Sequence, residues 1–398
     1  MTPPQIPRIE RLKVHNYRAL RDVSFTQLTP LTVLTGPNGS GKSTVFDVFA
    51  FLSEAFTEGL RPALEARNRL AELRSRGSDG PVTIEITYRD VDNVLITYHL
   101  AISEGSAGRP IVEREWLRVS RQRRGYPPHF LDFSNGAGTV MDEPDSIDTR
   151  QHEQLKSADL LAVSALGQLE RHPRISSLRS FITGWYLSYV AADSTRATPI
   201  SGPTEHLSRS GDNLPNVVQY LVEERPDTWD QIRRVLADRV PQLQTIEAET
   251  LSDNRLLLRL RDAPFAEPII SRFVSDGTLK LLAYLTVLYD PTPAPFIGLE
   301  EPENQLHPRL LPLLAEECRM ATEASQMLVT THSPEFLSEL RPDEVRVLYR
   351  DHTGYTQTTR VADMESVMPH VAAGANLGAL WRQGYFANAD PLAGAAPG

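Results

Sequence analysis

The chain has 398 residues and carries 41 Lys and Arg against 51 Asp and Glu, which gives a formal net charge of −10. Its residues are 40% hydrophobic and 23% charged, as in an average soluble globular protein, and this excludes bulk disorder and a coiled-coil rod. The length favours one large α/β domain with an insertion, or two domains. The acidic balance argues against a uniformly basic nucleic-acid-binding protein, although it is compatible with a local basic patch.

Three features of the sequence bear on its compartment. The longest apolar run, residues 281–289, is interrupted by Thr286 and is shorter than the roughly 18 residues that span a bilayer. The first ten residues contain no apolar signal core. The single cysteine, Cys318, permits neither an internal disulfide nor a cysteine-based metal cluster. We therefore expect a cytoplasmic protein with no membrane partner.

The N-terminal part of the chain predicts a strand, a glycine-rich loop and a helix, followed by antiparallel strands. Residues 8–14 alternate between apolar and polar types, which is typical of a strand. A β-branched run at 30–35 precedes the loop GPNGSGKST, and apolar residues between 45 and 56 then recur at helical spacing. Alternating segments within 81–133 predict antiparallel strands, and the polar segment 135–155 predicts a loop.

The remainder of the chain changes from helices to alternating strands and helices. Residues 157–240 are mostly helical in pattern, with a polar break at 192–212. Beyond residue 254 the sequence predicts strands at 255–260, 295–300, 326–331 and 344–350, and helices at 276–289 and 308–320. A further strand is expected after Gly354. We see no internal repeat.

Residues Gly36, Gly41, Lys42 and Ser43 satisfy the pattern G-x-x-x-x-G-K-[ST]. Glycines allow consecutive backbone N–H groups to face an anion, and the following helix adds the positive end of its dipole. Lys42 would supply a point charge for the β- and γ-phosphates of a nucleotide, and the Ser43 hydroxyl would bind Mg²⁺. The alternative is an ordinary glycine turn with a solvated lysine, which the flanking strand and helix disfavour.

Two buried strands end in polar residues that could complete this site. Phe296–Leu299 leads into Glu300 and Glu301, and the carboxyl end of a parallel strand faces the ligand crevice. Glu300 could hold Mg²⁺, and Glu301 could orient and deprotonate the attacking water. His332 ends the next strand, where it could contact the γ-phosphate or the water. The alternatives are two solvated acids and a structural histidine.

Ser275, Asp276 and Gly277 begin a predicted helix just before the carboxylate strand. A serine at a helix N-terminus offers a hydroxyl, free N–H groups and the positive end of the dipole, which together predict a second anion site. One nucleotide does not need two complete phosphate sites in one chain, so a two-fold dimer is the natural arrangement. The alternative is a plain serine N-cap.

The motif order GPNGSGKST, VSDGT, IGLEEPENQLHP and LVTTHSP resembles the ABC-type ATPase heads of the RecF, SMC and OLD group, in particular the short stand-alone bacterial "AAA family" ATPases. The resemblance covers about residues 1–60 and 255–350. It implies an α/β P-loop NTPase fold, an ABC-type head with a mixed sheet, an antiparallel β arm and a helical insertion. It also implies ATP and Mg²⁺ as cofactors and a homodimer formed through the ATP sites.

The resemblance assigns roles to individual residues. Glu300 and Glu301 would be the Walker B pair with its catalytic acid, and His332 the switch histidine. Arg18 would lie near the nucleotide, and 302–307 would be the D-loop. The signature motif acting in trans would be Ser275, Asp276 and Gly277. The Walker A loop would comprise Asn38, Gly39, Ser40, Gly41, Lys42, Ser43 and Thr44, and the preceding Gly36 and Pro37 would also bind the nucleotide.

The same resemblance gives an expected domain organisation. Residues 1–150 would form the N-terminal ATPase lobe with Walker A and the β-rich arm, and 151–254 a mostly helical insertion. Residues 255–388 would form the C-terminal lobe with the signature, Walker B and switch histidine, and 389–398 a flexible tail.

The sequence departs from the family pattern in ways that narrow the function. Glu300 replaces the usual Asp, and the signature reads VSDGT, which argues against a transporter motor. No Q-loop glutamine can be placed. No acidic DxD cluster follows His332, so we expect no fused nuclease of the kind found in OLD proteins.

These observations lead to one main functional hypothesis. The chain would be an Mg²⁺-dependent ATPase that dimerises head-to-head around ATP and switches a DNA-repair or anti-phage defence process, with a separately encoded effector such as a nuclease. The alternative is an ATP-gated sensor or scaffold with negligible turnover.

One basic stretch leaves DNA or RNA binding open. It contains Arg114, Arg118, Arg121, Arg123 and Arg124, near Trp116 and Tyr126. A solvated hairpin edge is the favoured interpretation, because Glu113 and Glu115 interleave with the arginines.

Overall fold

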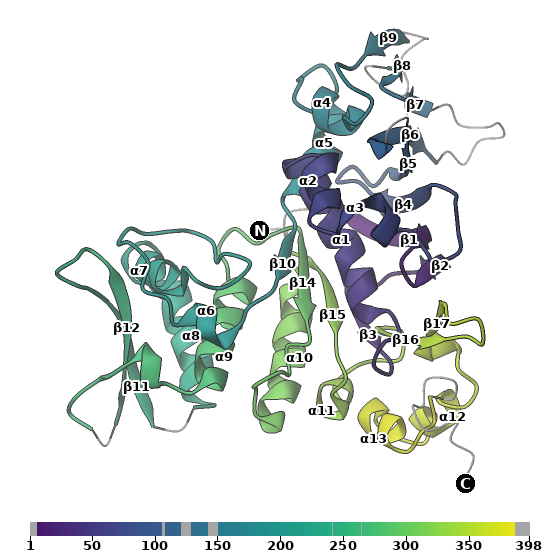
Figure 1. Ribbon diagram of the computed structural model, residues 1–398. Helices are drawn as coiled ribbons and strands as arrows, with labels where there is room; N and C mark the ends of the chain where they lie inside the picture. Colours follow the sequence, from purple (N-terminus) through teal and green to yellow (C-terminus); the bar gives the residue numbers. More distant parts are fainter. Residues whose placement is uncertain are drawn as a thin grey trace. The chain divides into compact units, whose positions relative to one another are not determined.

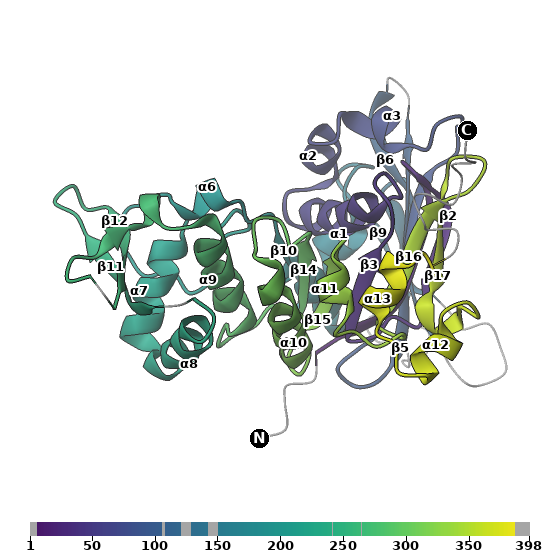
Figure 2. The same cartoon turned by 90° about the horizontal axis from the view of Figure 1, so that it is seen from below.

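The computed structural model describes residues 6–105, 108–120, 129–141, 150–240, 242–263 and 265–386 (Figures 1 and 2). The chain forms two compact units. The first comprises residues 1–185, 341–375 and 380–398, and the second comprises 186–340 and 376–379. The expected tail at 389–398 lies outside the described residues. Among the described residues, no helix combines the length and the apolar character needed to cross a membrane.

The first unit contains an eight-stranded antiparallel sheet in the order β2-β1-β4-β5-β6-β7-β8-β9. Alternation of side chains buries one face, as β4 shows with every second residue buried. The strands are β1 (Arg8–Tyr17), β2 (Leu20–Thr26), β4 (Val82–Arg89), β5 (Leu95–Glu104), β6 (Pro110–Val119), β7 (His129–Ser134), β8 (Ala137–Val140) and β9 (Gln151–Gln154).

The prediction of a loop at 135–155 is wrong in part, because β8 and β9 lie within this segment. These two strands pair with each other at the edge of the sheet, and β9 consists of the polar residues QHEQ, which are alternately half-buried and exposed. An edge strand with little buried surface carries no apolar alternation for sequence analysis to detect.

A second group of elements in the first unit carries the glycine-rich loop. The fully buried β3 (Leu31–Thr35) runs parallel to β16 (Val345–Arg350), which pairs antiparallel with β17 (Thr356–Arg360). The helices of this unit are α1 (Lys42–Thr57), α2 (Leu60–Glu65), α3 (Arg69–Leu73), α4 (Ala162–Leu166), α5 (Pro173–Thr183) and α12 (Met368–Ala372); α13 (Leu377–Arg382) follows. Figure 1 shows α1, α2 and α3 beside the strands of the antiparallel sheet.

The second unit contains the parallel strands β10 (Tyr186–Ser188), β14 (Phe296–Glu300) and β15 (Gln326–Thr330). A small antiparallel sheet, β11 (Leu243–Thr250), β12 (Leu256–Asp262) and β13 (Ile269–Ile270), contacts α7. The helices are α6 (Ala192–Thr195), α7 (Leu214–Glu224), α8 (Pro226–Ala237), α9 (Asp276–Leu288), α10 (Leu311–Ala321) and α11 (Pro334–Leu337).

The expected helical segment around 175–190 is shorter in the structure. Helix α5 ends at Thr183, Gly184 follows it, and the chain then forms β10 beside β14. Leu187 in this strand is fully buried. A continuous apolar run does not by itself distinguish a buried strand from a helix, which explains the error.

Candidate functional site

The glycine-rich loop joins β3 to α1, and two of its glycines are required by geometry. Gly36 has φ +147°, and a Cβ there would lie 2.1 Å from the Leu348 carbonyl oxygen on β16. Gly41 has φ +107°, and a Cβ there would lie 2.4 Å from Thr356 Oγ1 on β17. Any side chain at either position would strain the backbone and collide with the neighbouring strand.

The same strands also hold the loop by hydrogen bonds. The Arg350 guanidinium donates to the Gly39 carbonyl at 2.5 Å, and the Thr356 hydroxyl donates to the Ser40 carbonyl at 2.8 Å. The Gly39 and Ser40 carbonyl oxygens therefore already accept hydrogen bonds from β16 and β17. This arrangement favours a loop whose N–H groups bind an anionic ligand.

Lys42 begins α1 and is almost fully buried. Its ammonium group donates to the Gly36 carbonyl at 2.9 Å and to the Pro37 carbonyl at 3.1 Å. The Ser40 hydroxyl is also buried and has no hydrogen-bond partner within the described part of the chain, whereas Ser43 is exposed. A cation, an unsatisfied hydroxyl and a helix N-terminus on one loop fit a phosphate group.

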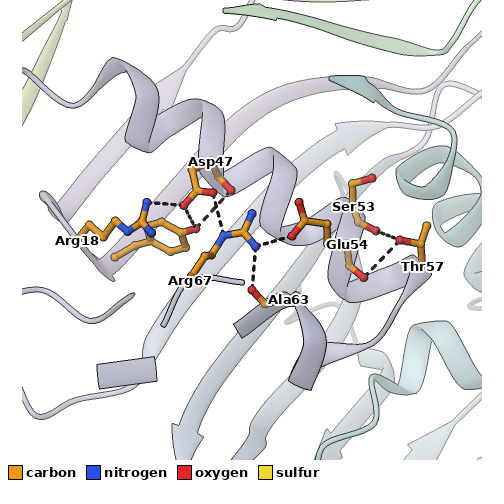
Figure 3. Close-up of polar contacts among 8 residues, drawn as sticks. Arg18, Asp47, Ser53, Glu54, Thr57, Ala63 and Arg67 are labelled. Carbon is orange, nitrogen blue, oxygen red and sulfur yellow. Dashed lines mark hydrogen bonds and ion pairs between the residues drawn. The ribbon is translucent and has the colours of Figure 1, made fainter. Parts of the chain in front are cut away.

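Arg18 lies beside α1, where a carboxylate holds it. Its guanidinium donates to Asp47 Oδ2 at 2.8 Å, and the Tyr17 hydroxyl donates to the same oxygen at 2.8 Å. Arg67 Nε donates to Asp47 Oδ1 at 2.8 Å, so Asp47 lies between two arginines (Figure 3). The sequence pointed to Arg18 but carries no signal for its partner Asp47. Its position near a nucleotide stays a prediction.

Arg67 is the buried centre of this network, with 6% of its side chain exposed. Besides Asp47, it donates to Glu54 Oε2 at 2.5 Å and to the Ala63 carbonyl at 2.8 Å (Figure 3). Burial alone would lower the pKa of Arg67, but the hydrogen bond to Glu54 and the nearby charges raise it above its ordinary value. The guanidinium therefore remains charged and fixes α1 to the segment after α2.

In the second unit, β14 ends at Glu300, and Glu301 takes a left-handed conformation with φ +42°. The Glu301 N–H donates to the Thr330 carbonyl at 3.0 Å and lies 3.1 Å from its hydroxyl. Glu301 Oε1 lies 3.1 Å from His332 Nε2, and Asn304 donates to Oε2 at 3.1 Å. Glu301 and His332 are thus brought together as a pair, each about one-third exposed.

The segment after Glu301 is fixed by three further hydrogen bonds that the sequence did not reveal. Glu303 accepts hydrogen bonds from the Thr331 hydroxyl at 2.8 Å and the His332 N–H at 2.5 Å. Lys280 on α9 donates to the Asn304 carbonyl at 2.8 Å. Burial lowers the pKa of Lys280, and the carboxylates of Glu303 and Glu301 oppose that shift. Lys280 is one of only four lysines in the chain, and this rarity is the sequence signal that could have identified it.

Helix α9 begins where the sequence predicted. Ser275 is its N-cap, with the Oγ accepting from the Thr278 N–H at 3.2 Å. Asp276 forms an ion pair with Arg196, which also donates to the Val274 carbonyl at 2.7 Å. Ser275 therefore caps the helix, and anion binding by this helix end stays a prediction.

The basic stretch identified in the sequence is only partly described, since Arg121, Arg123, Arg124 and Tyr126 lie outside the described residues. Arg114 pairs with Asp132 at 3.1 Å, as expected for a solvated strand. Glu115 is completely buried, so it cannot belong to a solvated edge and that part of the interpretation is wrong.

The proposed site residues therefore form separate groups in the two units. The Lys42 loop and Arg18 belong to the first unit, and Glu300, Glu301, His332 and the start of α9 belong to the second. No group of three or more His, Cys, Asp or Glu side chains among the described residues could hold a metal ion alone. Magnesium in proteins is commonly held by one or two carboxylates together with substrate phosphates, so the donor set is compatible with it.

Comparisons with known proteins agree with this arrangement. Residues 31–338 match the family described as "AAA domain, putative AbiEii toxin, Type IV TA system". A 99-residue segment is 34% identical to the chromosome partition protein Smc of Thermoplasma acidophilum, and it covers 24% of this chain and 8% of that protein. The chain thus matches only a small part of that relative's length.

Solved structures show the same fold. An Smc head bound to the C-terminal winged-helix domain of ScpA matches with a TM-score of 0.54 and 14% identity, over 88% of this chain and 97% of that chain. An Smc head with an extended coiled coil, bound to the C-terminal domain of ScpA derived from Pyrococcus furiosus, matches with a TM-score of 0.52 and 13% identity, over 92% and 100%. The chain belongs to the AAA-domain family that its residues match, and its fold is that of the Smc head domains.

Proposed function

We propose that this protein is an Mg²⁺-dependent ATPase whose nucleotide binds at the Lys42 loop. The observation that carries the proposal is the loop geometry, in which Gly36 and Gly41 cannot be replaced without collision and the Lys42 ammonium lies against the loop's own carbonyl groups. A bound phosphate would take those hydrogen bonds over from the Gly36 and Pro37 carbonyls. Charge-assisted hydrogen bonds of this kind are stronger than neutral ones.

The roles of the other residues follow from their chemistry. Ser43 and Glu300 would hold Mg²⁺, which would neutralise charge on the phosphate oxygens. Glu301 would accept a proton from the attacking water at a carboxylate oxygen. The contacts from His332 and Asn304 support this role, because they fix the orientation of the carboxylate. A positioned general base contributes roughly 10²–10⁴-fold to a rate.

We propose that two copies close around ATP, with the start of α9 from one copy facing the nucleotide on the other. Ser275, Asp276 and Gly277 would provide the hydroxyl and the N–H groups in trans. A Cβ at Gly277 would lie 2.9 Å from the Gln305 carbonyl of the same chain, so packing within the chain already favours glycine at this position. ATP binding would favour the closed dimer and hydrolysis would release it.

The closed dimer would act as a switch in DNA repair or anti-phage defence, through a separately encoded effector. The family's description, which names a type IV TA system, supports a role in a system of more than one component. The two solved Smc heads, each bound to a ScpA domain, support docking of a separate chain on such a head.

The test combines calorimetry, phosphate release and sedimentation of purified protein. Lys42→Ala should abolish ATP binding, whereas Glu301→Gln should keep ATP binding and dimerisation but lose turnover at least about 10²-fold. ATP binding that is unchanged in Lys42→Ala would refute the site. Dimerisation on ATP without turnover in the unmodified protein would favour the sensor or scaffold.

A further inference from the structure

A polar groove in the first unit lies outside the proposed nucleotide site. It encloses about 880 Å³ between the β1–β2 hairpin, strands β4 to β6, and the β16–β17 region. None of its lining residues belongs to the glycine-rich loop. Its charged lining consists of Glu10, Arg11, Glu85, Arg118, Asp343 and Arg360. This volume is in the usual range for small-molecule sites, about 300–1,000 Å³.

Two of these six charges are neutralised by neighbouring side chains. Glu10 accepts from Arg89 at 2.6 Å, and Arg360 donates to Asp363 at 2.8 Å. Asp343 lies 3.8 Å from Arg341, but Arg341 pairs more closely with Glu344 at 3.0 Å, so the Asp343 charge is only partly offset. Glu10 and Arg360 therefore contribute little net charge to the groove.

Arg11 and Arg118 differ, because neither forms an ion pair in the part of the chain that the structure describes. Arg11 is exposed on β1. The Arg118 guanidinium lies 5.2 Å from the centre of the Trp116 ring, and its Nε is buried without a hydrogen-bond partner. Stacking on an aromatic face holds a guanidinium in one orientation and leaves its N–H donors available.

The Trp116 ring is itself immobilised. It stacks between His99 and His129, with ring centres 4.8 and 4.7 Å away and planes within 8° and 6°. His99 lies 3.5 Å from Glu85, the remaining charged residue of the groove. Arg118 is therefore supported by a rigid row of rings across three strands, which reduces the entropy lost when it binds a ligand.

A further positive charge lies behind the groove. Arg346 on β16 is buried and donates to the carbonyls of Thr26 and Gln27, both of which line the groove. Burial, and the charge of Arg360 in the facing position of β17, lower the pKa of Arg346 to about 10, so it remains a cation at neutral pH. The groove therefore has an excess of positive charge, with the Glu85 carboxylate and the hydroxyls of Thr87 and Thr97 beside it.

We propose that this groove binds a small phosphorylated sugar, either a sugar phosphate or a nucleotide. Arg11 and Arg118 hold the phosphate through charge-assisted hydrogen bonds. Glu85, Thr87 and Thr97 accept or donate hydrogen bonds to the sugar hydroxyls. The mixed lining favours such a ligand over a nucleic-acid backbone, because the acidic groups would repel a continuous row of phosphates.

The test uses the full chain carrying Lys42→Ala, which removes phosphate binding at the glycine-rich loop. Ribose 5-phosphate, ribose and inorganic phosphate are titrated separately by calorimetry at low salt, with AMP as a fourth arm to separate a nucleotide from a sugar phosphate. We expect saturable binding of ribose 5-phosphate or AMP that is tighter than that of inorganic phosphate. Arg11→Ala and Arg118→Gln should each weaken it at least about tenfold, the size expected for a hydrogen bond to a charged group.

Arg69→Ala is the control, since Arg69 is an exposed arginine of α3 in the same unit and does not line the groove. It should change the affinity less than twofold. The proposal is overturned by three outcomes: no saturable binding of any sugar-containing probe, inorganic phosphate binding as tightly as ribose 5-phosphate, or equal losses in the groove-arginine variants and the Arg69 variant. Arg11 is a surface residue, so its variant answers the question even if Arg118→Gln does not fold.

Discussion

Glu115 on β6 is a completely buried carboxylate whose titration should be visible in the stability of the protein. It accepts hydrogen bonds from the Tyr98 hydroxyl at 3.0 Å and from the backbone N–H groups of Ala162 and Val163 at 2.5 and 3.2 Å. Burial raises its pKa to about 7, and these three donors only partly oppose that shift. Between pH 4.5 and 7 the folded protein therefore retains a proton that the unfolded chain releases.

The sign of the effect follows from this difference in proton binding. Because the folded state binds more protons between pH 4.5 and 7, the free energy of unfolding falls as the pH rises through this window. Below pH 4.5 the contribution of Glu115 to the free energy of unfolding is fully retained. A pKa raised from 4.5 to about 7 corresponds to about 3 kcal/mol, at 1.36 kcal/mol for each pH unit. That is a large fraction of the 5–15 kcal/mol by which proteins are typically stable.

Glu115→Gln isolates this contribution, because an amide has the shape of the protonated carboxyl group and does not titrate. We expect the variant to be about as stable as the unmodified protein at pH 4.5, and to gain about 3 kcal/mol relative to it by pH 8. Urea unfolding of both proteins at several pH values measures the difference. Parallel stability curves would refute the reasoning and show that the three donors keep Glu115 ionised throughout.

Three further predictions concern the glycine-rich loop, α1 and the carboxylate pair. Arg67→Met should lower the free energy of unfolding by about 1.5–3 kcal/mol, the range for loss of a hydrogen bond to a charged group, because Glu54 loses this partner while Asp47 keeps Arg18. Arg61→Ala, in a more exposed pair, should cost less than about 1 kcal/mol, and urea unfolding compares the two variants. Gly36→Ala should abolish ATP binding in calorimetry, since its Cβ would collide with the Leu348 carbonyl. His332→Asn should lower ATP turnover by about tenfold or more while leaving the affinity for ATP within a fewfold, since the histidine contacts Glu301; unchanged phosphate release would exclude that role.

The parts of the fold that could be predicted from the sequence are those in which neighbouring residues carry the structural signal. The buried strands β14 and β15, the start of α9 and the loop before Lys42 are each specified by residues adjacent in the chain. Glycine spacing and apolar runs are read without knowledge of the tertiary fold.

The parts that were missed depend on residues distant in sequence. Asp47 and Arg67 are 20 residues apart, and neither carries a motif. Glu115 resembled an exposed acid because it lies among arginines, but its two backbone donors come from residues 47 and 48 positions later and its hydroxyl donor, Tyr98, from 17 positions earlier. Such contacts exist only after the chain has folded.

The functional groups of both units already have protein partners, and this has a consequence for binding. The Lys42 ammonium contacts carbonyl groups of its own loop, and Asp276 is paired with Arg196. These contacts compensate the charges of the Lys42 ammonium and the Asp276 carboxylate, so neither group is an unpaired charge. A ligand must replace the Lys42 contacts with stronger ones, and a triphosphate does so where a neutral ligand cannot. If the nucleotide binds at this loop as proposed, its selection over neutral ligands follows from what Lys42 contacts before binding as well as from the charge that Lys42 carries.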